Sequence, residues 1–247
     1  MLAAGLTLAA ATVFAAQPAE AGFIEYAIRG TPIINSGPPT EFITDDPGDK
    51  AALGSNDVNG SKLGSIGSLK IDRLDDETRF TAGSGPAVAP YLNFWITDGA
   101  GNYAVVANEP SNAAFQPLFN DGYDLTFADL ADKVAKIYEN ADTSWLPNGG
   151  VGLTFADLAG FTIQAPSVAE LTVGWAGLGT GAPRELGTNI AYGVNWVFGD
   201  TLANYVSGDD GYIVANAVVT AIPEPGTLAL FGLGLAGLGL LRRRGTA

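Results

Sequence analysis

The chain of 247 residues contains no cysteine and no histidine. Without cysteine there is no disulfide, no thiol nucleophile and no Cys-ligated metal. Without histidine there is no Ser-His-Asp triad and no His-ligated zinc or iron centre. The side chains left for catalysis are carboxylates, hydroxyls and lysines, which leaves a carboxylate-dependent polysaccharide hydrolase open. Acidic residues are so frequent here that a close pair would say little about catalysis, and most of them lie in turns, where they solvate loops, so we expect that the protein is not an enzyme.

Positive charge is also scarce, with 12 Lys and Arg residues against 26 Asp and Glu residues. Three of the basic residues lie at the C-terminal end, and one acidic residue, Glu20, lies near the N-terminus. Without these four, the chain from Gly22 to Pro225 keeps 25 acidic and 9 basic residues, a net charge of −16. A phosphate backbone would be repelled by such a surface, so nucleic acid is excluded as a partner. The charge favours solubility and the binding of cations.

Residues 1–21 have the pattern of a secretory signal peptide. An apolar run, Leu2–Ala16, is followed by a short polar segment and an A-x-A cleavage site at Ala19 and Ala21. We therefore expect export by the Sec translocon, cleavage by signal peptidase and a mature chain that begins at Gly22. No Lys or Arg precedes the apolar run, which is the pattern expected if translation begins upstream. A buried N-terminal helix is the alternative, and it does not explain the cleavage site.

The segment from residue 222 onward has three consecutive parts. Pro223, Glu224 and Pro225 are followed by 16 uncharged residues, Gly226–Leu241, and the charge returns at Arg242, Arg243 and Arg244. A helix of this length rises about 24 Å, so spanning a bilayer core of ~30 Å requires snorkelling arginines or local thinning. The positive-inside rule places the arginines in the cytoplasm. An ordinary C-terminal anchor is the alternative, although such anchors are usually longer and poorer in glycine.

The order of a Pro-Glu-Pro tripeptide, a glycine-punctuated apolar helix and a terminal Arg cluster resembles the PEP-CTERM sorting signal of Gram-negative bacteria. The resemblance covers about a tenth of the chain. It implies recognition by an exosortase, an integral-membrane, cysteine protease-like enzyme that cuts near the Pro-Glu-Pro, in hosts that commonly make exopolysaccharide. The protein would be anchored transiently in the inner membrane, with its ectodomain in the periplasm, and would then reach the outer surface or the extracellular matrix. The prolines keep the backbone extended, which suits the presentation of Glu224 to a protease.

Residues 22–221, the ectodomain, have the pattern of one mainly β domain. Alternating apolar and polar residues predict strands, most clearly at Tyr91–Thr97 and Tyr103–Asn108, which a glycine-rich hairpin joins. In the first of these strands Leu92, Phe94 and Ile96 would face the core. Roughly eight to ten short strands separated by glycine-rich turns indicate an antiparallel β-sandwich, jelly-roll-like, with one or two short helices.

The heptapeptide LTFADLA occurs twice, at residues 125–131 and 153–159. In each copy a Thr could cap a helix, and the Asp three residues later suits the helix dipole. We expect the first helix to continue through Val134 to Ile137 and the second to stop at Gly160. Two copies are too few for a solenoid, which leaves a helix start used twice or a duplicated half-domain.

Two sets of ectodomain side chains could bind ligands. Aromatic rings could stack on a sugar, with packing under a neighbouring loop as the alternative; they are Tyr91, Trp95, Trp145 and Trp175. Oxygen-rich turns could bind Ca²⁺, although none matches the EF-hand loop. The predicted calcium ligands are Asp98, Asn102, Asp121, Asp124, Asp209 and Asp210, and similar turns contain Asp45, Asp46 and Asp49, and Asn56, Asp57 and Asn59.

The sequence thus predicts an exported, exosortase-processed protein of the cell surface or extracellular matrix, with a structural or adhesive role associated with exopolysaccharide. The alternatives are a calcium-assisted carbohydrate-binding module and a carboxylate-dependent polysaccharide hydrolase. Exposed coplanar aromatic rings on one sheet face would favour the binding module. A deep cleft with two facing carboxylates would favour the hydrolase.

Overall fold

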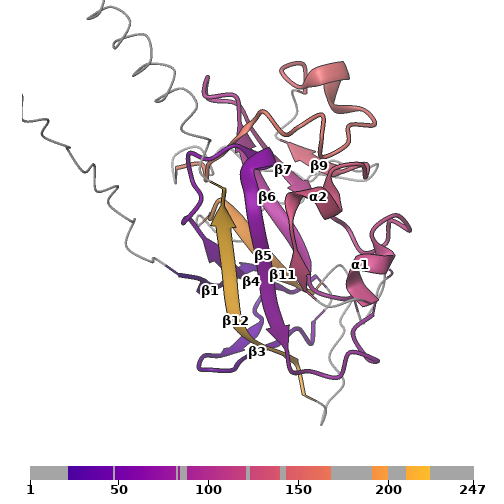
Figure 1. Cartoon of the computed structure of the whole chain (residues 1–247). Helices are drawn as coiled ribbons and strands as arrows, with labels where there is room; N and C mark the ends of the chain where they lie inside the picture. The colour runs from indigo at the N-terminus through magenta and orange to yellow at the C-terminus, as the bar shows by residue number, and fades with distance from the viewer. Residues whose placement is uncertain are drawn as a thin grey trace, which may run out of the picture.

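The computed structural model of the chain (Figure 1) describes residues 22–46, 48–81, 83, 88–120, 123–139, 143–167, 191–199 and 210–222. Within these residues the fold is mainly β, and every pairing between the strands named below is antiparallel. The predicted fold class is confirmed to this extent. The jelly-roll arrangement stays a prediction.

The strands of the described residues form two sheets. The seven-stranded sheet runs in the order β1 (Ile24–Arg29), β4 (Lys50–Ser55), β11 (Val194–Phe198), β6 (Tyr91–Thr97), β7 (Tyr103–Ala107) and β9 (Lys136–Glu139), and β10 (Thr162–Ile163) also pairs with β6. The five-stranded sheet runs in the order β2 (Ile33–Asn35), β3 (Thr40–Ile43), β12 (Tyr212–Ala221), β5 (Ile66–Arg73) and β8 (Asp124–Leu125). In Figure 1, β12 and β5 lie in front of β4 and β11.

Within the described residues, four short helical segments accompany the sheets. They are the α-helices α1 (Gln116–Asn120) and α2 (Phe127–Leu130) and the 3₁₀ helices η1 (Leu63–Ser65) and η2 (Pro147–Gly150). None of the helices in the described part of the chain is long and apolar enough to cross a membrane. The helix predicted at residues 226–241 lies outside that part.

Aromatic side chains from both sheets meet in one buried cluster. Phe42 of β3 stacks on Phe198 of β11, with ring centroids 4.3 Å apart, and Phe198 also contacts Tyr212 of β12. The rings of Phe42, Phe198 and Tyr212 are almost completely buried. Each such side chain removes a large apolar area from water, so these contacts between sheets are a main source of stability.

The predicted hairpin is confirmed. Strand β6 has the predicted bounds, it pairs with β7 from Asn93 opposite Ala107 to Thr97 opposite Tyr103, and the side chains of Leu92, Phe94 and Ile96 belong to the main core. The opposite face of β6 is covered as well. There Trp95 packs with Val105 in a second, smaller cluster that Tyr103, Tyr138 and Ala191 adjoin.

The long helix predicted from the first heptapeptide copy is wrong. Helix α2 ends at Leu130 after one turn, and Ile137 lies instead in β9, opposite Val106 of β7. Lys133 Nζ donates to the backbone oxygen of Asp129 at 2.7 Å, and Lys136 pairs with Glu109. Pairing with β7 therefore overrides the helical periodicity of this segment, as tertiary context commonly does.

The two copies nevertheless begin in the same way. In each, the Asp carboxylate accepts hydrogen bonds from the backbone N and the hydroxyl of the Thr three residues earlier, at 2.7 and 2.8 Å in the first copy and 2.8 and 2.8 Å in the second. The second copy forms a turn rather than a helix. The copies lie side by side, since Ala135 N donates to Leu153 O and Ala156 N donates to Ala131 O.

Candidate functional site

The predicted sugar-stacking platform is not formed by Tyr91 and Trp95. Both side chains are buried, each 4% exposed, and the Tyr91 hydroxyl accepts a hydrogen bond from Lys50 Nζ at 2.8 Å. Trp145 is half-buried and packs edge-to-face on Phe161, with centroids 5.5 Å apart. Trp175 lies outside the described residues. Neither ring presents a face to a sugar, because Tyr91 belongs to the main core and Trp95 packs with Val105 in the smaller cluster.

The hairpin pair Asp98 and Asn102 closes a turn. Asp98 Oδ1 accepts from Ala100 N at 2.8 Å, and its Oδ2 accepts from Asn102 Nδ2 at 2.7 Å. The hydrogen bond from Asn102 is the main reason that the pKa of Asp98 is lowered. Both carboxylate oxygens are thus used within the hairpin, an arrangement that explains these residues without a metal.

The two other predicted calcium ligands within the described residues, Asp124 and Asp210, lie in different parts of the fold. Asp124 lies in β8 opposite Lys70, whereas Asp210 lies before β12, where its backbone oxygen accepts a hydrogen bond from Arg79. Asp121 and Asp209 lie outside the described residues. Among the members of this predicted set that the structure describes, only Asp98 and Asn102 come together.

A different acidic group is the one place, among the described residues, where three acidic side chains lie close enough to share a metal ion. It consists of Asp45, Asp46 and Asp49, in the loop that joins β3 to β4, and one oxygen of each carboxylate lies within 4.8 Å of the others. Asp45 and Asp46 are exposed. Asp49 is 2% exposed. We call these three side chains the Asp49 cluster.

Backbone contacts hold Asp49 in place. Its Oδ1 accepts a hydrogen bond from Thr31 N at 3.0 Å, and its own N donates to Asp46 O at 3.1 Å. Gly30 has a φ of +73°, and a Cβ on it would lie 1.9 Å from Asp49 Oδ1. Gly199 has a φ of +88°, and a Cβ on it would lie 2.5 Å from Asp49 O. Only glycine fits at such positions. The carboxylate is therefore set in a close-fitting backbone environment, and its Oδ2 is buried without a hydrogen-bond partner.

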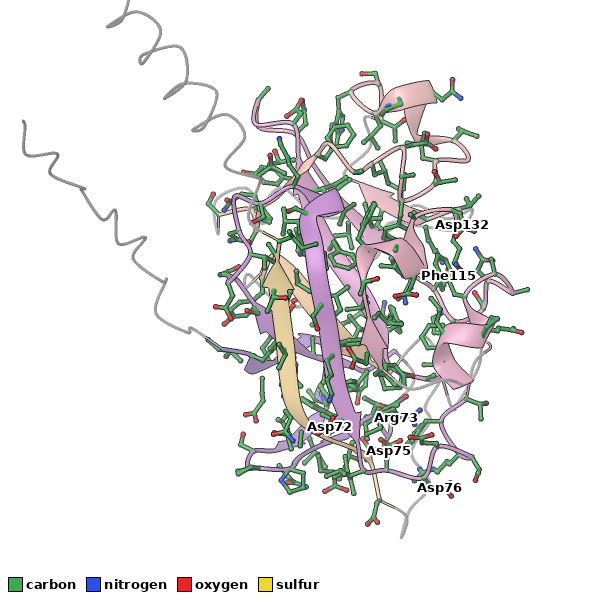
Figure 2. All side chains as sticks on the ribbon, in the orientation of Figure 1. Asp72, Arg73, Asp75, Asp76, Phe115 and Asp132 are labelled. Carbon is green, nitrogen blue, oxygen red and sulfur yellow. The ribbon has the colours of Figure 1, made fainter. Side chains whose placement is uncertain are left out.

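A buried ion pair that the sequence did not predict lies at the end of β5. Figure 2 shows Arg73 and Asp75 next to each other there. The guanidinium donates to the Asp75 carboxylate through Nε, at 3.3 Å, and through Nη2, and it also donates to Phe80 O at 3.2 Å. The Arg73 and Asp75 side chains are 2% and 0% exposed.

Surrounding groups favour the charged form of Arg73. Burial opposes the charge, but the hydrogen bond and the charge of Asp75 outweigh it and raise the pKa of Arg73. Tyr123 lies against the guanidinium, with its ring 5.2 Å away, and burial raises the pKa of its hydroxyl, which stays neutral. Asp75 is bound on both oxygens by one arginine, so it suits a structural pair better than an acid or base in catalysis. In the sequence, the only sign of this ion pair is that Arg73 precedes Asp75 by two residues within an acidic turn.

The structure describes the ectodomain side of the junction with the predicted sorting segment, up to Ile222. Strand β12 ends at Ala221, and Ile222 N donates to Ser65 O at 2.7 Å. Pro223, Glu224 and Pro225 follow directly, but they lie outside the described residues, as do Arg242, Arg243, Arg244, Ala19 and Ala21. The hydrogen-bonded part of the domain therefore reaches the residue before the tripeptide.

Comparison with protein-family models matches residues 221–244 to the PEP-CTERM protein-sorting motif. The match includes the Pro-Glu-Pro tripeptide, the apolar run and the three arginines. Comparisons with curated proteins and with solved structures found no match.

Proposed function

The chain carries a PEP-CTERM protein-sorting motif at residues 221–244, and from this premise we propose a structural or adhesive role for the ectodomain that the motif delivers. The motif implies export, transient anchoring in the membrane and processing by an exosortase. In our proposal the ectodomain crosses the inner membrane through the Sec translocon, loses residues 1–21 to signal peptidase and is released from its anchor in the periplasm. It then serves at the cell surface or in the extracellular matrix, in association with exopolysaccharide.

The observation that carries the proposal is the position of the motif directly after a central strand. Strand β12 pairs with β3 on one side and with β5 on the other, and Ile222, the last described residue, is still hydrogen-bonded through its backbone N to Ser65 O. A cut near Pro223–Pro225 removes no residue of either sheet. Processing would thus separate a complete folded domain from its anchor.

The packing of the domain supports a structural role over the two alternatives. A sugar-binding module needs exposed rings, and Tyr91 and Trp95 are buried. A hydrolase needs two available carboxylates. The buried carboxylate of Asp75 is not available, because the Arg73 guanidinium neutralises it. We also propose that the two sheets close into a jelly-roll-like β-sandwich, which the contacts of Phe42 with Phe198 support.

Fractionation of the native host tests this proposal. The wild-type protein should appear in the outer-surface or exopolysaccharide fraction, whereas Glu224→Ala should stay in the inner-membrane fraction with the same total amount of protein. Glu77→Ala, which replaces an exposed acid elsewhere in the ectodomain, is the matched control and should fractionate as the wild type does. Recovery of processed wild-type protein as a freely soluble species, with none in the surface or exopolysaccharide fraction, would refute the structural role.

A further inference from the structure

We propose that the Asp49 cluster is a calcium-binding site. One oxygen from each of Asp45, Asp46 and Asp49 lies within 4.8 Å of the others. Calcium takes oxygen ligands at about 2.3–2.6 Å, so two oxygens bound to the same ion are at most about 5 Å apart. The spacing of the three carboxylates therefore fits a single ion between them.

The buried carboxylate of Asp49 is the observation that distinguishes this cluster from an ordinary acidic turn. The residue is 2% exposed, its Oδ1 is occupied by Thr31 N, and its Oδ2 has no hydrogen-bond partner. A buried ionised oxygen without a partner is costly, and native proteins almost always supply one. By contrast, both oxygens of Asp98 are used within its hairpin. A cation between the three carboxylates would supply the partner that Asp49 lacks.

The chemistry of the site favours calcium. Its charged ligands are all carboxylates, and the chain has no histidine or cysteine with which to hold a softer metal. An irregular loop with two exposed carboxylates suits the flexible coordination of calcium better than the strict octahedron of magnesium. Water and backbone oxygens would complete the coordination. Arg29, at the end of β1, donates through Nε to Gly48 O of this loop at 2.6 Å, and its positive charge reduces the net negative charge beside the cluster.

The position of the cluster suggests what calcium would do. The loop joins β3 of the five-stranded sheet to β4 of the seven-stranded sheet, and the backbone oxygen of Asp49 lies against Gly199, just after β11. An ion bound here would fix the crossing between the two sheets. Calcium at the concentrations outside the cell, where the proposed function places the ectodomain, would then increase its stability. Affinities of extracellular calcium modules, roughly 0.1–1 mM, are sufficient for this.

Thermal unfolding of the full-length chain in mild detergent tests the site. The protein is first stripped with EGTA, and CaCl₂ is then added while NaCl keeps the ionic strength constant. We expect 5 mM CaCl₂ to raise Tm by roughly 2–8 °C and 5 mM MgCl₂ to raise it by less than half as much. Calorimetric titration of the same sample should give one site with a Kd of roughly 0.1–1 mM.

Two variants separate the site from a general effect of calcium. Asp49→Asn keeps an oxygen for Thr31 N but removes the buried charge, so its calcium-free Tm should equal or exceed that of the wild type and should not respond to calcium. Asp45→Asn combined with Asp46→Asn changes only exposed side chains, and it should weaken calcium binding at least about tenfold. Asp98→Asn is the matched control and should keep the full response.

The outcomes that would overturn the site are specific. They are a wild-type Tm that calcium does not change, an equal response to magnesium, or a full calcium response in Asp49→Asn. If Asp49→Asn does not fold, the Asp45→Asn, Asp46→Asn variant decides, because a full response there places calcium elsewhere. None of these results depends on exosortase processing, so the site can fail while the proposed function holds.

Discussion

Replacing Asp75 by alanine should destabilise the domain by about 3–5 kcal/mol, because the substitution leaves the Arg73 guanidinium buried without its partner. The two side chains are 2% and 0% exposed, so water cannot replace the lost carboxylate without opening the end of β5. The same substitution at Asp72 provides a matched control. Asp72 pairs with Lys70 at 3.5 Å, with side chains 38% and 43% exposed, so Asp72→Ala should destabilise the domain far less than Asp75→Ala.

The paired substitution Arg73→Met, Asp75→Leu gives the reasoning a second test. It removes both charges together, so no uncompensated charge remains in the core. The Phe80 carbonyl loses the donor that Arg73 supplied at 3.2 Å, which should cost about 1–2 kcal/mol. The double variant should therefore be more stable than Asp75→Ala, although it changes more side-chain atoms.

Thermal unfolding followed by circular dichroism measures these differences. For a domain of this size, about 3–5 kcal/mol corresponds to a fall in Tm of roughly 6–20 °C, and the Tm of the control should fall by far less. Urea unfolding should give the same order of stabilities, with an unchanged m-value. Equal stability of Asp75→Ala and Asp72→Ala would refute the account of a buried, structurally required ion pair.

Three further predictions concern other parts of the domain. Gly199→Ala sets a Cβ 2.5 Å from Asp49 O and should lower the free energy of unfolding in urea by more than about 2 kcal/mol. Gly101→Ala, at a φ of +94° but with open space around the Cβ, should lower it by about 1 kcal/mol. Equal losses would contradict the close fit at Gly199. A chain that stops after Ile222 should show cooperative unfolding, whereas one that stops after Gly211 lacks the central β12 and should not; cooperative unfolding of the shorter chain would contradict the sheet order. The pKa of Asp98 is lowered in the folded state, mainly by the Asn102 hydrogen bond, so its contribution to stability is present above about pH 4 and is lost as the pH falls through the folded pKa. The urea concentration at the unfolding midpoint should therefore decrease when the pH is lowered from about 5 to about 2.5, and it should decrease less in Asp98→Asn. An identical decrease in both proteins would contradict the assignment.

Local patterns were enough to predict the β6–β7 hairpin, because both strands alternate and a glycine-rich turn separates them by only a few residues. They did not predict β4. Its sequence, KAALGS, shows no alternation, since five of its six residues are buried between β1 and β11. A strand covered on both faces cannot be recognised by a period of two. Its neighbour β11 lies more than a hundred residues later in the chain, so only the folded structure brings the two together.

The candidate sites differ in the same way. Alternation placed Trp95 correctly on the face of β6 opposite Leu92, but whether that face is open depends on Tyr138 of β9, a long-range contact. The Asp49 cluster was one of several similar acidic turns in the sequence. What separates Asp49 from Asp98 is burial, which composition does not encode. The sorting motif, by contrast, is linear, so its residues could be recognised without the fold.

The most direct test of the account is the intact mass of the protein isolated from its native host, alone and as Glu224→Ala. We expect a wild-type species that begins at Gly22 and ends between Pro223 and Pro225, and a variant that keeps every residue to Ala247. This result would mean that processing releases the domain directly after Ile222, the last residue that the structure describes, whose backbone N is bonded to Ser65 O. A mature wild-type protein that still contains Arg242, Arg243 and Arg244 would instead make the C-terminal segment a permanent anchor and would contradict the account.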